Sequence, residues 1–256
     1  MNMKAKYSIS LLVAAVALLA LSVPVHASKM DSRIESAAKK SYVFKTYLKG
    51  DDINIESKDG AVTLTGTVSE ESHKSLAQET VASLPGVKSV DNRLEVKGEH
   101  PVEKSDAWIS TKMKTTLLFH RSVSAMTEVN TKDGIVTLKG DADNQAQKDL
   151  TTEYANDIDG VKDVKNEMTV SKTVKKTHNT VGEKIDDASI TALVKMTLLY
   201  HRSTSALNTK VETKHGVVTV SGKANESAEK DLVSKLVNDA KGVKSINNQM
   251  TIEESK

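Results

Sequence analysis

Two stretches of the chain place an aromatic residue, a histidine and an arginine in a row at the predicted end of a helix. In chain order these residues are Phe119, His120, Arg121, Tyr200, His201 and Arg202. A guanidinium offers forked donors that match the oxygens of a phosphate, and an aromatic ring beside it suits the headgroup region of a membrane. The pattern therefore predicts a contact with an anionic headgroup or a phosphate group.

A structural interpretation of the same residues is also open. Histidine and arginine at the end of a helix satisfy its last carbonyl groups and interact favourably with its dipole, while the aromatic side chain packs. The two interpretations are compatible.

The sequence contains none of the common catalytic or cofactor motifs. It has no Gly-x-Ser-x-Gly, phosphate loop or His-Glu-x-x-His motif and no cysteine. Its histidines do not have the close spacing of metal ligands. Acidic pairs such as Asp51-Asp52 and Glu70-Glu71 fall at predicted turns and helix starts, where they favour the helix dipole. We therefore expect no enzymatic activity, no cofactor and no metal ion.

Glycine and asparagine recur with the same spacing in three copies of one segment. Each copy has two glycines six residues apart, then a Gly-Val pair and an asparagine. The recurring positions are Gly60, Gly66, Gly86, Asn92, Gly134, Gly140, Gly160, Asn166, Gly216, Gly222, Gly242 and Asn248. Such a pattern predicts a small domain repeated in tandem, with its glycines at turns or tightly packed positions. The asparagines lie among inward apolar residues, so we expect their amides to be hydrogen-bonded within the fold rather than to bind a ligand.

Each repeat reads as a helix, a β-hairpin, a second helix and a last strand. In the third copy Asp186-Asp187 suit the start of a helix, in which Ile190, Val194 and Leu198 recur every fourth residue. The pair Asp59-Gly60 and its equivalents predict two-residue hairpin turns, because both residues tolerate positive φ.

The second helix has predicted start and end signals in every copy. Ser69, Asp143 and Asn225 occupy one equivalent position and suit an N-cap. The glycine of each Gly-Val pair is expected to end the helix. The segment between the hairpin and the last strand is long enough for a helical crossover, so the last strand should run parallel to the second hairpin strand. The predicted fold class is α+β: three tandem small domains, each helix-hairpin-helix-strand (αββαβ), with a three-stranded mixed sheet and helices on one face.

Trp108, the single tryptophan, lies near the start of the first helix of the second copy, where the third copy has Ser189. An amphipathic ring at this position suits a membrane interface or a partner. Packing against the linker at 100–102 or against a neighbouring repeat is equally compatible with the sequence.

The first residues have the composition of a secretory signal peptide. Lys4 and Lys6 precede an apolar stretch, and Val25-His26-Ala27 provides small residues for cleavage after Ala27. We expect export to the periplasm and no transmembrane span in the mature chain. Cleavage would remove these two lysines and leave equal numbers of basic and acidic residues in the mature chain. Such a balance argues against a nucleic-acid partner.

The helix, the run Lys58-Asp-Gly-Ala-Val-Thr-Leu-Thr-Gly66, the capped helix and the ending Gly86-Val-Lys-Ser-Val-Asp-Asn92 together resemble the BON domain. All three copies match, and the arrangement resembles the periplasmic, osmotically inducible BON-repeat proteins. The resemblance implies a non-enzymatic role, association with phospholipid surfaces at the cell envelope and support of the envelope under stress.

The predicted function is that of a non-enzymatic periplasmic envelope and osmotic-stress protein. It would associate multivalently with anionic phospholipid or with envelope proteins. The alternative is a periplasmic chaperone or scaffold that binds polypeptides. The predicted divisions are 1–27 (signal peptide), 28–98 (first domain), 99–104 (linker), 105–173 (second domain), 174–185 (linker) and 186–254 (third domain).

Overall fold

The computed structural model describes residues 24–98, 101–170, 184–204 and 209–252. The predicted signal peptide lies outside the described residues except for its last four, which belong to the first described helix, α2 (Pro24–Lys40). Most of the linker 174–185 also lies outside them.

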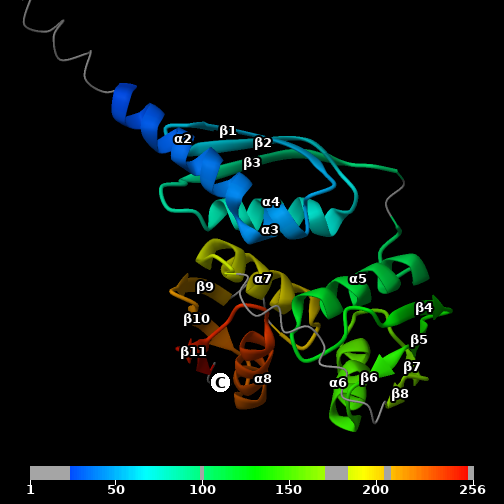
Figure 1. Ribbon diagram of the computed structural model, residues 1–256. Coiled ribbons are helices and arrows are strands. Elements are labelled where there is room, and N and C mark those ends of the chain that lie inside the picture. The colour runs from blue at the N-terminus through cyan, green and yellow to red at the C-terminus, as the bar shows by residue number, and fades with distance from the viewer. Residues whose placement is uncertain (1–23, 99–100, 171–183, 205–208, 253–256) are drawn as a thin grey trace, which may run out of the picture.

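The first repeat is an antiparallel hairpin extended by a parallel third strand (Figure 1). Its elements are α2, α3 (Tyr42–Thr46), β1 (Asp52–Lys58), β2 (Ala61–Val68), α4 (Glu71–Ala82) and β3 (Ser89–Val96). The sheet has the order β1-β2-β3, and the helices lie on one of its faces (Figure 1). Alternate residues of β2, among them Val62, Leu64 and Val68, are buried against these helices.

The second and third repeats follow the same path, but their last strands are interrupted. The second repeat consists of α5 (Asp106–Phe119), β4 (Glu128–Lys132), β5 (Ile135–Lys139), β6 (Asp141–Ala142), α6 (Gln145–Asn156), β7 (Asp163–Asn166) and β8 (Thr169–Val170). The third consists of α7 (Asp187–Tyr200), β9 (Thr209–Lys214), β10 (Val217–Ala224), α8 (Ser227–Asp239), β11 (Ser245–Asn248) and β12 (Thr251–Ile252). Central strands β5 and β10 each pair antiparallel with the first hairpin strand and parallel with β7 or β11. The predicted fold class is confirmed.

The hairpin turns have the predicted geometry. Asp59 and Gly60 have φ values of 53° and 84°, and the equivalent pairs repeat these values closely. Positive φ at both central residues defines the turn that matches the twist of paired strands.

The predicted caps of the second helix were wrong by one residue. The N-caps are Glu70, Asn144 and Glu226, each of which follows the predicted residue. The predicted residues instead lie just outside the helix: the backbone N–H of Asp143 donates to Gln147 Oε1, and that of Asn225 donates to Glu229 Oε2, both at 2.7 Å.

The predicted glycine ends of these helices were also displaced. The C-caps are Ser83, Asp157 and Ala240, so each glycine lies beyond the helix in the following turn. A Cβ on Gly242 would lie 2.8 Å from Cγ1 of Ile190, so glycine lets this turn approach the first helix.

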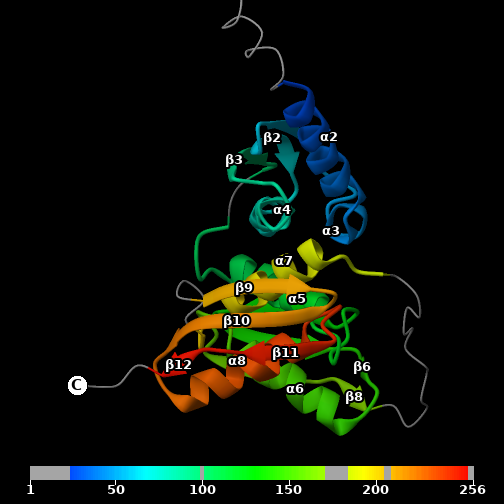
Figure 2. The same cartoon turned by 90° about the vertical axis from the view of Figure 1, so that its left-hand side faces the viewer.

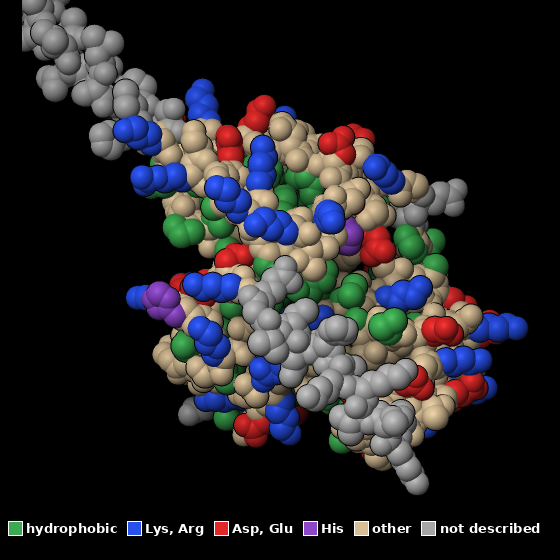
Figure 3. Space-filling model, viewed as in Figure 1, with side chains coloured by type: hydrophobic (Ala, Val, Ile, Leu, Met, Phe, Trp, Pro, Cys, Tyr) green, Lys and Arg blue, Asp and Glu red, His purple; other side chains and the backbone are tan. Residues whose placement is uncertain are grey.

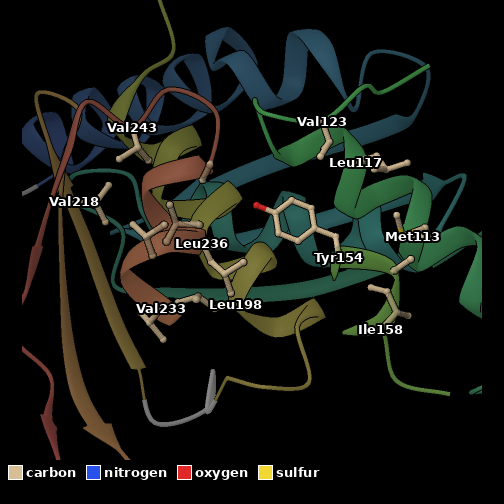
Figure 4. Packing of buried hydrophobic residues seen from close by; sticks show 14 of the residues in the cluster. Met113, Leu117, Val123, Tyr154, Ile158, Leu198, Val218, Val233, Leu236 and Val243 are labelled. Carbon is tan, nitrogen blue, oxygen red and sulfur yellow. The ribbon is translucent and has the colours of Figure 1, made fainter. Parts of the chain in front are cut away.

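Two clusters of buried apolar side chains hold the three repeats together. One joins the cores of the second and third repeats, and Figure 4 shows Tyr154 between core residues of the two. The other contains the core of the first repeat and one face of α7, including Ala192, Leu193 and Met196. Helix α7 therefore packs on its own sheet with one face and on the first repeat with the other, and Figure 2 shows it between these two parts.

Candidate functional site

The histidine–arginine stretches meet at the interface between the second and third repeats. His120 is the C-cap of α5, and its Nδ1 lies 3.0 Å from Oδ2 of Asp239 at the end of α8. His201 is the C-cap of α7, and its Nδ1 lies 2.7 Å from Oδ2 of Asp157 at the end of α6. Each repeat thus supplies a histidine to the other and receives one from it.

Backbone and hydroxyl contacts repeat this exchange. The N–H of Arg121 donates to the carbonyl of Asp239 at 3.0 Å, and the N–H of Arg202 donates to that of Asp157 at 3.1 Å. The hydroxyl of Ser122 donates to the Asp239 carboxylate, as the hydroxyl of Ser203 does to that of Asp157. The interface is reciprocal, because equivalent residues make equivalent contacts in both directions.

The two imidazole rings also contact each other. Their Nε2 atoms lie 3.3 Å apart and their planes are nearly perpendicular, at 88°. Both rings are buried, His120 completely. Burial lowers the pKa of His120, because the charged imidazolium loses its hydration; Asp239 opposes this shift and the nearby His201 adds to it.

Tyr154 makes the interface asymmetric. Its hydroxyl donates to Oδ2 of Asp239 at 2.6 Å, whereas Leu236 occupies the corresponding position of the third repeat. Burial alone would raise the pKa of Asp239, but the hydrogen bonds from His120, Ser122 and Tyr154 outweigh it and keep that pKa below its usual value. Burial and this carboxylate raise the pKa of Tyr154 strongly.

The two aromatic residues of the predicted contact are buried within the chain. Phe119 and Tyr200 stack with ring centroids 6.4 Å apart, and Tyr47 of the first repeat packs edge-on to Phe119 at 5.6 Å. They join the first repeat to the ends of α5 and α7.

The arginines and Trp108 remain nearer the surface. The side chains of Arg121 and Arg202 are 47% and 49% exposed, and each Nε lies only loosely beside its aspartate, at 3.9 and 3.8 Å. Trp108 is partly buried beside Lys112, whose Nζ lies 4.8 Å from the indole centre and 3.9 Å from the ring centre of Tyr200. Burial lowers the pKa of Lys112.

A cavity of about 500 Å³ opens beside this group, between the first repeat and α5. Its lining includes Val96, Trp108, Leu199 and Tyr200 as well as Glu70 and Glu71. A cavity of this size can bury an apolar side chain or a small amphiphile.

The asparagine of each repeat joins the last strand to the second helix. The Asn248 amide donates to the carbonyl of Lys230 at 2.9 Å, and its Oδ1 accepts the N–H of Met250 at 3.0 Å. Asn92 and Asn166 make the equivalent bonds.

A basic face on the first repeat was not anticipated. Exposed lysines and an arginine lie along α2, α3 and the turn after α3. Figure 3 shows Lys and Arg side chains gathered over this repeat. The exposed basic residues are Lys29, Arg33, Lys39, Lys40, Lys45 and Lys49. Among nearby acidic residues, Asp31 is buried and bonded to the hairpin turn through the N–H groups of Asp59 and Gly60. The sequence signal was the high density of lysine in this segment.

Two further groups of structural residues were missed. Asp157 and Asp239 stand at equivalent positions of the two repeats that carry His-Arg-Ser, whereas the first repeat has Ser83 there and lacks that motif. The aspartate and the His-Arg-Ser motif are thus present together or absent together, and this pattern in the sequence could have indicated that they are in contact. Asp106 and Asp187 anchor their hairpin turns as Asp31 does.

Within the described ranges, no cluster of three or more His, Cys, Asp or Glu residues is arranged to hold a metal ion. No helix in those ranges combines the length and apolar character needed to cross a membrane.

Comparison with known proteins identifies one domain type three times. The family model described as BON domain matches residues 30–98, 105–172 and 186–254. Osmotically-inducible protein Y of Escherichia coli (strain K12) is 33% identical over 143 residues, covering 54% of this chain and 71% of that protein. An uncharacterized protein in the gshII 5'region of Anaplasma centrale is 29% identical over 151 residues, covering 59% of this chain and 97% of that protein.

Solved structures of CdsD, a structural protein of the type III secretion system of Chlamydia trachomatis, align at 16% identity. The first covers 87% of this chain and 91% of its own, with a TM-score of 0.26. This value is too low for conclusions about the arrangement of the repeats.

Proposed function

Because the chain belongs to the BON domain family, we propose that it is a non-enzymatic envelope protein of the osmotic-stress response, exported to the periplasm. It associates there with anionic phospholipid or another anionic envelope surface through several weak contacts. The similarity to osmotically-inducible protein Y supports the stress role.

The observation that carries the surface association is the basic face of α2 and α3. The full chain has a formal net charge of only +2, so a cluster of exposed cations on one repeat is a local feature. Basic residues near an anionic membrane contribute about 1 kcal/mol each, and the attraction falls with ionic strength. Several such residues on one face give weak, salt-sensitive binding.

Arg121, Arg202 and Trp108 form a second proposed contact region. The two guanidiniums are half exposed at equivalent positions of the repeat interface, and they suit phosphate oxygens. The buried residues Phe119, His120, Tyr200 and His201 cannot reach a membrane surface in this conformation. Two charged regions on one chain would add avidity to weak single contacts.

Vesicle co-sedimentation tests the proposal. We expect the chain to sediment with anionic but not with zwitterionic vesicles, and to dissociate as the salt concentration rises. Replacing Lys39, Lys40 and Lys45 by Gln should reduce binding several-fold. The matched control replaces three exposed lysines of the second repeat, Lys132, Lys139 and Lys165, and should bind nearly as the wild type does.

The arginine region is tested separately. Arg121→Gln with Arg202→Gln should weaken anionic binding, while the control Arg93→Gln on the first repeat should not. Trp108→Ala should weaken binding with less salt dependence, because its contribution is apolar. Unchanged binding in all these variants would exclude both regions as the contact surface.

The cavity beside Trp108 favours one alternative function, a chaperone or scaffold that binds polypeptides. Its apolar lining and the half-exposed Leu199 could accept an apolar side chain of a client. Suppression of client aggregation in the absence of vesicles, lost in Leu199→Asp, would favour this alternative over lipid association.

A further inference from the structure

The contact between His120 and His201 constrains where protons can reside. Each Nδ1 faces a carboxylate oxygen, Oδ2 of Asp239 or of Asp157. A charged carboxylate accepts hydrogen bonds and cannot donate them, so each Nδ1 must carry its proton. That leaves the two Nε2 atoms, 3.3 Å apart, to face each other.

Only one proton satisfies this Nε2 pair. With none, two lone pairs oppose each other at a distance where a hydrogen bond is possible. With one, the protonated Nε2 donates to the other, and the ring pair carries a single positive charge. With two, two N–H groups and two positive charges oppose each other inside a buried interface.

The charged groups around the rings do not stabilise a second proton on the Nε2 pair. The ionisable groups that face the ring pair are Asp157, Asp239, Arg121, Arg202, Lys241 and Tyr154. Both carboxylates are already engaged by an imidazole N–H and a serine hydroxyl, and Asp239 also accepts the Tyr154 hydroxyl. The remaining neighbours are cations or a neutral phenol, which do not stabilise another positive charge.

We propose that His120 and His201 form an acid-sensitive switch between the second and third repeats, closed when the rings share one proton and opened when both rings become charged. The contacts that would separate are the reciprocal ones of this interface, including the bonds from the N–H groups of Arg121 and Arg202. Opening exposes Tyr154 and the apolar residues around it.

The direction of the pH effect follows from proton linkage. In the separated state both rings are hydrated, and a hydrated imidazole has an ordinary pKa near 6.5. The pKa of His120 in the closed interface is lowered by burial, so the closed form binds fewer protons than the open form below this pH. Acid therefore favours opening, because the open form then binds two protons and the closed form one, and this excluded proton weakens closure about tenfold per pH unit. Above pH 6.5 the open rings bind no proton, so closure is strongest near that pH.

Distance measurements on the full chain test the switch. The chain has no cysteine, so Lys165→Cys and Asn247→Cys place two spin labels at equivalent exposed strand positions of the second and third repeats. We expect one short distance distribution at pH 6.5, where the two rings together bind one proton, and a longer, broader one at pH 5. The double substitution His120→Gln with His201→Gln should keep one distribution at both pH values.

Two controls separate this effect from general acid unfolding. His215→Asn removes an exposed histidine from a hairpin turn of the third repeat and should respond as the wild type does. Circular dichroism should show unchanged secondary structure across the same pH range. A wild-type distribution that stays constant to pH 5, or a Gln variant that opens as the wild type does, would overturn the proposal.

NMR titration of the unlabelled wild type provides a readout that needs no variant. The ring Hε1 signal of His120 should titrate below the ordinary pKa of histidine, and the contact of this ring with the ring of His201 should be lost at the acidic end. A contact between the two rings that is retained to the end of the acid titration would also overturn the proposal.

Discussion

Leu193 and Lys112 occupy equivalent positions on α7 and α5, yet they face different surroundings. Leu193 is fully buried beneath the first repeat, whereas the Lys112 ammonium lies over the rings of Trp108 and Tyr200 beside an open cavity. Three residues further along the helices, α7 has the apolar Met196 where α5 has the polar Thr115. The apolar second face of α7 explains why the first repeat docks on the third repeat's first helix.

Truncation of Leu193 should loosen the first repeat. Leu193→Ala is expected to lower the free energy of unfolding by about 2–5 kcal/mol, because it leaves a cavity between repeats. Leu199→Ala on the same helix, where the side chain is 47% exposed, should cost far less. Urea unfolding monitored by fluorescence measures both variants, and equal losses would contradict the docking role.

The hydrogen bond from Tyr154 to the Asp239 carboxylate should stabilise the fold at neutral pH. Tyr154→Phe removes one donor to this carboxylate and should cost about 1.5–3 kcal/mol at neutral pH. The matched variant Tyr47→Phe, which loses a bond of 3.3 Å to a neutral carbonyl at an exposed site, should cost less. Urea unfolding at pH 7 compares the two.

The same variant has a signed pH effect. The depressed pKa of Asp239 contributes stability that is present above the unfolded value near 3.9 and is lost as the pH falls through the folded pKa. Without the Tyr154 hydroxyl this folded pKa should rise, so acid destabilisation should begin at a higher pH. An unchanged acid limit, followed by thermal unfolding between pH 2 and 5, would contradict this role.

The asparagine of the last strand should protect a particular amide. Asn248→Ala removes an acceptor from the N–H of Met250 and a donor to the carbonyl of Lys230, and it should cost about 1–3 kcal/mol. Hydrogen exchange at Met250 should accelerate. Asn247→Ala, one residue away and exposed, serves as the control and should leave that exchange rate nearly unchanged.

The second and third repeats should recognise each other without a covalent link. Separate chains of residues 105–172 and 186–256 are expected to associate when mixed, because the reciprocal contacts do not require the linker. Sedimentation velocity measures the complex. Asp239→Ala in one chain should abolish it, since the substitution leaves His120 without its partner.

Local features of the fold were predictable because they depend on short stretches of sequence. The stripe of Ile190, Val194 and Leu198 is buried as periodicity indicates, and the Asp59-Gly60 turn has the expected positive φ values. The helix starts were displaced by one residue. In the second and third repeats the side chains of Gln147 and Glu229 accept the backbone N–H of the residue just before the N-cap. Such a bond moves the effective start of the helix without changing its pattern.

The candidate site was predictable in composition but not in partners. His120 and Arg121 were correctly singled out as differing between the repeats, but their contact with Asp239 spans more than a hundred residues. A single sequence gives no distance information at that range. Comparison of the three repeats does indicate the partners, because the two repeats with the histidine have an aspartate at the position where the first repeat has Ser83. The individual motifs do not contain this information.

The reciprocal histidine–aspartate exchange has a consequence for how the array grew. A surface that binds its own copy is satisfied as soon as one duplicate is added, so duplication of a single gene segment supplies both halves of the second and third repeats' interface at once. A third unit finds no free half and must attach elsewhere. The first repeat lacks the exchange residues and rests on α7, so the protein resembles a pseudo-symmetric dimer of its second and third repeats with the first repeat appended.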